Sequence, residues 1–283
     1  KRNHEGHTYE RNILVVIPGK NRKEVVVMGD HYDTAYMEDV YDVDRGGSGA
    51  HISANGADDN YSATSTLLQA ASIFLKMSKE GKLERDIWLI HLTGEEFPSD
   101  CLGARNFCQK MVENTLKLRI DKDHIIDLSG TNIVGGFVMD MIGHNRDNSR
   151  GIFQISPGKS LQSLKNAQQA HIANMIWNAS TLEWNKSPER INATAGKRST
   201  DDKTIPEKAK HLPIIGEVRT KYDPFSSIYN TDGQIFSDIG APIVLFMENY
   251  DLHRSGYHDT KDTMDNIDLD YGAALAAICI ETV

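Results

Sequence analysis

The sequence predicts a three-layer α/β/α fold built on a central mixed, largely parallel sheet. Short runs of β-branched and aliphatic residues, which are typical of buried strands, punctuate the chain. Longer segments with helical spacing of apolar residues lie between them. Strands that alternate with helices favour a layered domain in which helices cover the sheet.

The individual elements follow from the same patterns. The expected strands are residues 13–17, 25–28, 87–92, 133–139 and 243–247. The expected helices are residues 62–77, 103–112, 161–177 and 269–280. We therefore expect a single domain over residues 1–283.

Two long stretches interrupt this alternation. Residues 35–56 are rich in Gly, Asp, Tyr and Ser, and residues 180–231 include a polar segment with several Lys and Thr residues. Loops of this length in a compact domain are usually lids, binding loops or disordered segments. We expect these two insertions to select the substrate.

Composition limits the classes of function. With 283 residues, 39% hydrophobic, the chain is long enough to bury a large core. Its net charge of -9 argues against nucleic acid, which is bound by clustered Lys and Arg. No apolar run approaches the length of about 18 residues that a transmembrane helix needs.

Cysteine content and the first residue bear on the compartment. Cys101, Cys108 and Cys279 form an odd set and a poor disulfide framework. The chain opens at Lys1 without Met, which indicates a mature or trimmed form. These features leave the compartment open, and an exported protein, periplasmic or secreted, is favoured over a cytoplasmic one.

The first candidate site residues end an expected strand, in GDHYDT at residues 29–34. Residues two apart on extended backbone face the same way, so Asp33 can accept a hydrogen bond from the imidazole of His31. The other ring nitrogen of His31 is then available for a metal. Taken alone, such a pair is more often an ordinary surface contact.

Two aspartates and two glutamates add carboxylates. Asp58 and Asp59 precede an expected helix, where one carboxylate could cap the helix while the other faces a cation. Glu95 and Glu96 follow an expected strand, and neighbouring side chains there point in different directions. One glutamate can bind a metal while the other handles a proton, although solvated loop residues are the simpler interpretation of either pair alone.

Asp140 and His258 complete the set. Asp140 interrupts an apolar run, where an unpaired carboxylate would cost several kcal/mol of desolvation, so it needs a cation. His258 lies in YHDTKDT. Alone it would be read as an ordinary loop histidine, and it becomes a candidate ligand only together with the other residues. Two imidazoles and three carboxylates are suited to zinc, and five ligands exceed the needs of one tetrahedral ion. We expect two Zn²⁺ ions that share a bridging carboxylate.

These motifs resemble the M28 metallopeptidases, a family that includes aminopeptidases, glutamate carboxypeptidases and the related glutaminyl cyclases. GDHYDT, GADDN, TGEEF, VMDMIG and YHDTKDT follow the family's order between about residue 12 and residue 283. The resemblance implies that the metal ligands are His31, Asp59, Glu96, Asp140 and His258, with Asp59 bridging. It also implies that Glu95 is the general base and that Asp33 is the partner of His31. Asp232 falls in the family's SDHxxF region, but Gly233 stands where many members have histidine.

The function expected from this resemblance is a metallo-exopeptidase, a hydrolase acting on peptide substrates. An aminopeptidase that removes N-terminal residues through a metal-bridging water is the first choice. The alternatives are a glutaminyl cyclase with one zinc, and a carboxypeptidase or dipeptidase of the same family. A non-enzymatic binding protein, as in the transferrin receptor ectodomain, is disfavoured because every expected ligand is present.

Overall fold

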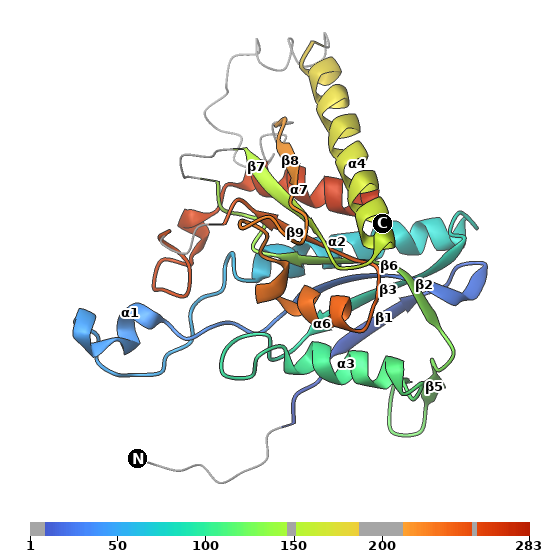
Figure 1. Cartoon of the computed structure of the whole chain (residues 1–283), viewed down its shortest axis with the longest axis horizontal. Coiled ribbons are helices and arrows are strands. Elements are labelled where there is room, and N and C mark those ends of the chain that lie inside the picture. Colours follow the sequence, from blue (N-terminus) through green and yellow to red (C-terminus); the bar gives the residue numbers. More distant parts are fainter. Residues whose placement is uncertain (1–8, 146–150, 187–211, 251–253) are drawn as a thin grey trace, which may run out of the picture.

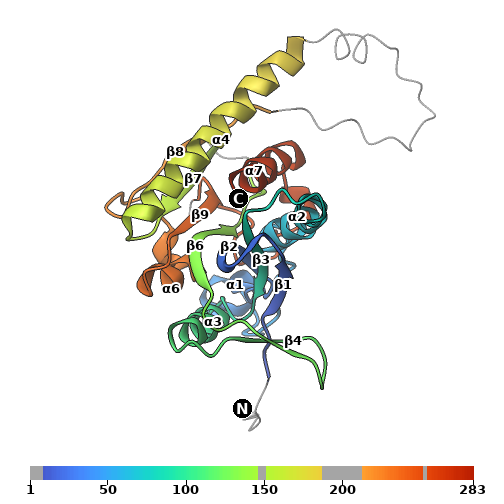
Figure 2. The ribbon, with the colours of Figure 1, turned by 90° about the vertical axis from the view of Figure 1, so that its right-hand side faces the viewer.

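A computed structural model describes residues 9–145, 151–186, 212–250 and 254–283 of the chain. It confirms the expected fold: helices cover both faces of a central mixed sheet (Figures 1 and 2). Among the described residues, no helix is both long enough and apolar enough to cross a membrane.

The described part of the sheet has seven strands. In order across the sheet they are β1 (Ile13–Ile17), β3 (Arg85–Leu92), β2 (Asn21–His31), β6 (Asn132–Asp140), β9 (Ile243–Glu248), β7 (Ile152–Pro157) and β8 (Ile215–Val218). The four strands β3, β2, β6 and β9 are parallel to one another. β1 is antiparallel to β3, and β7 is antiparallel to β9 and parallel to β8.

Helices form two layers around this sheet. One face packs against α2 (Tyr61–Lys79), α4 (Leu161–Lys186) and α7 (Leu269–Thr282). The other face packs against α3 (Leu102–Val112) and the short α6 (Asp232–Asp238). Successive side chains of a strand point to opposite faces of the sheet, so alternate residues of the buried strands pack against the two helix layers. In β9, Val244 and Phe246 face the first layer, whereas Leu245 faces the second.

In the long helix α2, the sequence accounts for both the buried face and the end of the helix. Its buried positions Ala63, Leu67, Ala70 and Phe74 recur at helical spacing and face the sheet. The helix ends at Lys79, and Gly81 then takes a left-handed conformation (φ 69°) that glycine adopts without strain.

The structure corrects several sequence expectations. β7, β8 and α6 were not expected, because they are short and their polar or glycine residues break the apolar pattern. A small hairpin of β4 (Lys117–Arg119) and β5 (Ile125–Asp127) also lacks such a pattern. α4 continues to Lys186, past the expected start of the second long loop at residue 180.

The two expected insertions are only partly described. Residues 35–56 contain the single-turn α1 (Glu38–Tyr41) and the 3₁₀ turn Val43–Arg45, and a bridge between Tyr36 and Ser53 closes the stretch. Residues 187–211 of the second insertion lie outside the described residues. Its remainder holds β8 and the 3₁₀ turn Ile228–Asn230, and a third such turn, Met264–Asn266, precedes α7.

Candidate metal centre

The parallel strands bring their carboxyl ends to one edge of the sheet. His31 is the last residue of β2 and Asp140 is the last residue of β6. Glu95 and Glu96 follow the end of β3, the neighbour of β2. Open α/β sheets place their ligands at this edge, which is therefore where a site is expected.

Asp59 lies between two histidines at the centre of the cluster. Its Oδ1 is 3.2 Å from His31 Nε2, and its Oδ2 is 3.2 Å from His258 Nε2. The same His31 nitrogen is 3.3 Å from Asp140 Oδ1, and the same His258 nitrogen is 3.2 Å from Glu96 Oε2. All five residues expected as metal ligands thus gather in one place, with one carboxylate shared between two halves.

Burial and neighbouring charges shift the pKa values of the cluster residues. Burial, reinforced by the charge of Asp59, raises the pKa of Glu96 to about 7, and burial also raises the pKa of Asp140. Burial alone would lower the pKa of His258, but its contacts with Asp59 and Glu96 raise that pKa to about 10. Three buried carboxylates and two imidazoles compete here for a limited number of protons.

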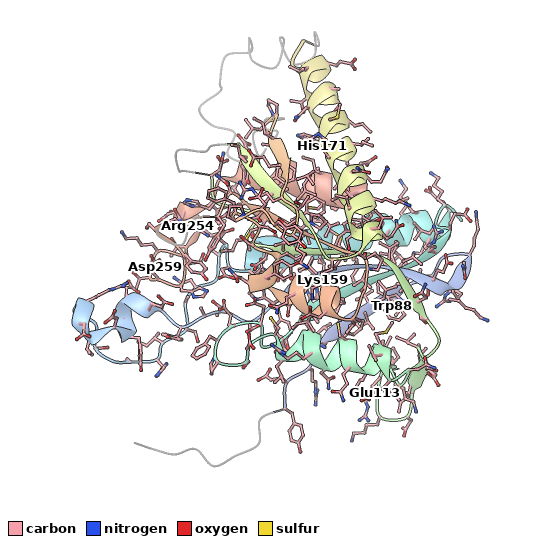
Figure 3. All side chains as sticks on the ribbon, viewed as in Figure 1. Trp88, Glu113, Lys159, His171, Arg254 and Asp259 are labelled. Carbon is pink, nitrogen blue, oxygen red and sulfur yellow. The ribbon has the colours of Figure 1, made fainter. Side chains whose placement is uncertain are left out.

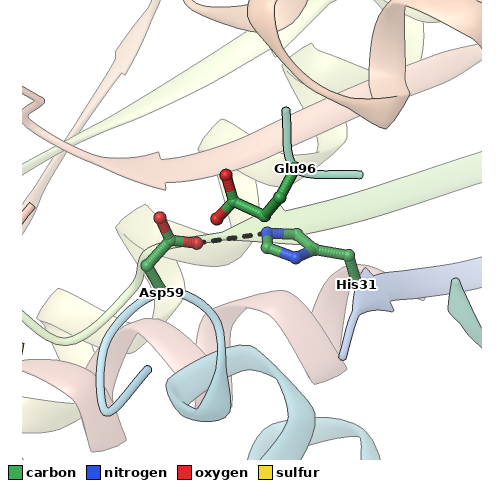
Figure 4. A group of neighbouring side chains, drawn as sticks. All are labelled: His31, Asp59 and Glu96. Carbon is green, nitrogen blue, oxygen red and sulfur yellow. Dashed lines mark ion pairs between the residues drawn. The ribbon is translucent and has the colours of Figure 1, made fainter. Parts of the chain in front are cut away.

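The residues present fit a metal ion. Ligand atoms from His31, Asp59 and Glu96 all lie within 4.8 Å of one another (Figure 4). Glu96 Oε1 is buried and has no hydrogen-bond partner among the described residues, a costly state that a cation would relieve. A set of imidazole nitrogens and carboxylate oxygens suits zinc.

Glu95 stands apart from these ion pairs and borders the adjoining cleft. Burial raises its pKa well above the usual range; nearby His31 opposes the shift, while Asp140 and Asp232 add to it. A carboxyl group that readily holds a proton suits a general acid–base residue. Cys101 Sγ lies 4.0 Å from one of its oxygens.

Asp33 lies beside His31 as expected, and its carboxylate is within ion-pair distance of the imidazole, although beyond hydrogen-bond distance. Its Oδ1 is 3.7 Å from His31 Nδ1, and the closer contact of that nitrogen, at 3.2 Å, is with the backbone oxygen of Asp33. The carboxylate instead accepts hydrogen bonds from the backbone N–H groups of Glu95 and Glu96, each at 3.1 Å. β2 ends at His31, so the alternation of an extended strand does not reach Asp33.

The expected helix cap is wrong. No side chain caps the N-terminus of α2. Asp58 instead accepts a hydrogen bond from the backbone N–H of Gly143 at 2.8 Å and pairs with Arg254 at 2.9 Å. The Asn60 side chain bonds the backbone of β6 and of Met141. The segment before α2 is therefore fixed by long-range contacts rather than by its own helix.

Sequence reasoning missed Arg254, which is labelled in Figure 3. Its guanidinium lies 2.9 Å from both Asp58 and Glu248, and all three side chains are buried. Glu248 at the end of the apolar strand β9 was the available signal, because a carboxylate buried there needs a positive partner.

A cleft of about 280 Å³ opens beside the cluster. Its lining includes polar groups of the site and the apolar side chains of Phe97, Ile235 and Met247. Tyr229 lines the cleft, and its hydroxyl is buried without a hydrogen-bond partner among the described residues.

Asp232 and Gly233 occupy the region where the sequence departs from the family pattern. Asp232 is buried, and burial raises its pKa to about 7. A Cβ at Gly233 would come within 3.0 Å of Ile228 and 3.1 Å of Thr231. A side chain at this position would therefore require small shifts of Ile228 and Thr231.

Comparisons with known proteins identify the family and the fold. The model of peptidase family M28 matches residues 12–224. No curated protein matches the sequence. Several solved structures share the fold at low sequence identity.

Three of these structures match nearly the whole of this chain. LapA aminopeptidase of Legionella pneumophila is 14% identical with a TM-score of 0.58, and the match covers 96% of this chain and 52% of that protein. A leucine aminopeptidase precursor from Bacteroides thetaiotaomicron is 18% identical with a TM-score of 0.58, over 97% and 76% of the two chains. A glutaminyl cyclase from the same organism, bound to N-acetylhistamine, is 18% identical with a TM-score of 0.58, over 96% and 76%.

The chain thus spans about half of the Legionella protein. At these identities the structures establish a common fold, and the family model, which covers most of the chain, establishes the family. The chain belongs to peptidase family M28.

Proposed function

We propose that the protein is a zinc-dependent exopeptidase, and specifically an aminopeptidase that hydrolyses N-terminal residues from peptides. The observation that carries the proposal is the shared position of Asp59, 3.2 Å from both His31 and His258. His31, Asp59 and Asp140 would hold one zinc ion, and Asp59, Glu96 and His258 would hold a second. Bound zinc would polarise a peptide carbonyl and make hydroxide available near neutral pH.

Glu95 supplies the acid–base chemistry in this proposal. It borders the cleft, and its ionised carboxylate can accept a proton from the attacking water; burial raises its pKa and so increases its affinity for that proton. It can then pass that proton to the leaving amine. The raised pKa keeps such a transfer within reach near neutral pH.

The charges around the cleft favour recognition of an amino terminus over a carboxyl terminus. Glu95, Glu96 and Asp140 line it. Arg105 is the only Lys or Arg among the described lining residues, and its guanidinium is paired with Asp100 at 2.7 Å. Zinc would offset the charges of Glu96 and Asp140, so the distinction rests on Arg105: the described lining offers a free substrate carboxylate no unpaired Lys or Arg.

The test joins metal analysis to a substrate screen. Purified protein is assayed for zinc content and for activity on aminoacyl-nitroanilides, N-terminal glutaminyl peptides and C-terminally free dipeptides. Two zinc ions per chain with release of free amino acids from the nitroanilides is the expected result. One zinc with a pyroglutamyl product would identify a glutaminyl cyclase, and cleavage only of blocked, C-terminally free dipeptides would identify a carboxypeptidase.

A further inference from the structure

His258 is the proposed ligand with the least support from regular structure. It lies in the loop between β9 and α7, and its backbone is left-handed (φ 49°). That conformation costs a residue other than glycine about 1–2 kcal/mol. A residue persists there only when its surroundings hold it.

Residues of α1, within the inserted residues 35–56, form hydrogen bonds with the loop that carries His258. The backbone N–H of Glu38 donates a hydrogen bond to the backbone oxygen of His258 at 2.7 Å. The carboxylate of the next residue, Asp39, accepts hydrogen bonds from the backbone N–H of Thr260 at 3.2 Å and from its hydroxyl at 2.7 Å. Two consecutive residues of the insertion thus clamp the backbone on either side of Asp259, which Figure 3 labels close to α1.

The imidazole of His258 lies between the cluster and this clamp. Its Nε2 faces Asp59 and Glu96, and its Nδ1 faces Glu38 Oε1 at 3.6 Å. The ring of Tyr257 stacks on it with centroids 3.9 Å apart. Histidines that bind metals commonly donate their second ring N–H to a carboxylate, which fixes the tautomer and increases the basicity of the ligand nitrogen.

We infer that Glu38 is a positioning residue, whose carboxylate orients His258 and strengthens its hold on a metal ion. The inference rests on the proposed zinc-dependent function, since it concerns one ligand of that site. It gives the insertion a role distinct from the expected selection of substrate. Glu38 is 53% exposed, so water weakens the interaction and the effect on metal affinity should fall near the lower end of the 10–100-fold range known for such partners.

The test measures zinc affinity directly, by competition with a chromophoric chelator, in wild type and three variants. Glu38→Ala removes the carboxylate but keeps the backbone N–H that bonds His258, so the weaker zinc site should lose about tenfold in affinity. Glu38→Gln should recover part of this loss, because its amide oxygen keeps an acceptor atom facing Nδ1. Asp44→Asn removes one charge from the same insertion and should leave the affinity within about twofold of wild type.

A fourth variant separates orientation of the imidazole from support of the loop. Asp39→Asn weakens the contacts with Thr260 without touching His258, so it should reduce zinc affinity less than Glu38→Ala. A loss equal to or greater than that of Glu38→Ala would overturn the inference, as would Glu38 variants that bind zinc within about twofold of wild type. Wild-type protein that binds no zinc would refute the proposed function itself.

Discussion

The guanidinium of Arg254 lies 2.9 Å from the carboxylate of Asp58, and neither side chain is exposed. Arg254 also pairs with Glu248 and donates a hydrogen bond to the backbone oxygen of Gly256 at 3.1 Å. Asp58 immediately precedes the shared carboxylate of Asp59. One buried cation therefore links the His258 loop, the segment before α2 and the end of β9.

Replacing Arg254 by methionine should destabilise the fold strongly. The change leaves Asp58 and Glu248 buried without their positive partner, which typically costs about 3–5 kcal/mol. Denaturant unfolding of the metal-free protein measures it. The control is Arg85→Met, which removes an exposed pair with Glu24 and should cost less than about 1 kcal/mol. Equal losses in the two variants would show that burial adds nothing to the role of Arg254.

Replacing Glu95 by glutamine should separate chemistry from metal binding. Glu95 makes none of the histidine contacts that define the cluster, so zinc content should stay at the wild-type value. The turnover number should fall by about 10²–10⁴-fold, the usual contribution of a general acid–base residue. Glu113→Gln, on an exposed helix end, is the matched control and should keep full activity. Substantial turnover in Glu95→Gln would assign the proton transfer to another group.

Replacing Asp33 by asparagine should loosen the turn that carries both glutamates. Asparagine has one acceptor oxygen, so it can accept from only one of the two backbone N–H groups. Its N–H₂ group would face the second N–H group, and two donors cannot bond. Zinc retention on dialysis and kcat/KM should both fall, by about 10–100-fold for metal affinity. Asp127→Asn alters an exposed carboxylate that likewise accepts from a backbone N–H, and it should change neither quantity. Wild-type zinc retention in Asp33→Asn would mean that the turn holds its shape unaided.

Zinc affinity should rise with pH and zinc binding should release protons. His258, with its pKa raised to about 10, is protonated at neutral pH in the metal-free protein, and Glu96, near 7, is partly protonated. A metal needs both groups deprotonated, so affinity should increase up to about pH 10. Titration calorimetry in two buffers of different ionisation enthalpy counts the protons released. An affinity that is constant between about pH 6 and 9 would contradict the coupling between zinc and protons.

The sequence predicted the parts of the fold that have a strong local pattern. The apolar strands such as Ile243–Glu248 and the long helix Tyr61–Lys79 were found within a few residues of their ends. The strand Ile215–Val218 was missed because it is four residues long and contains a glycine, and its position depends on pairing with a neighbouring strand rather than on its own residues. The end of α4 was placed too early, because its polar composition gives little helical periodicity.

The sequence predicted the five residues that gather in the cluster, but it did not predict the contacts that hold the surrounding segments in place. Carboxylates at strand ends are visible in a sequence, and the order of the motifs assembled the set that the structure brings together at Asp59. The partners of Asp58 and Asp33 depend on contacts between distant segments. Helix capping gave the wrong role for Asp58, and strand alternation gave the neighbour His31 of Asp33 but not its backbone partners, because tertiary contacts outweigh local preferences.

The gathering of side chains from five separate stretches of chain affects when the protein can hold metal. His258 follows the other four proposed ligands in chain order, so a nascent polypeptide lacks one half of the centre until that stretch has emerged and docked. The disordered chain would offer no comparable chelate. Zinc would then shift the folding equilibrium by mass action, and the melting temperature should climb with the concentration of free ion.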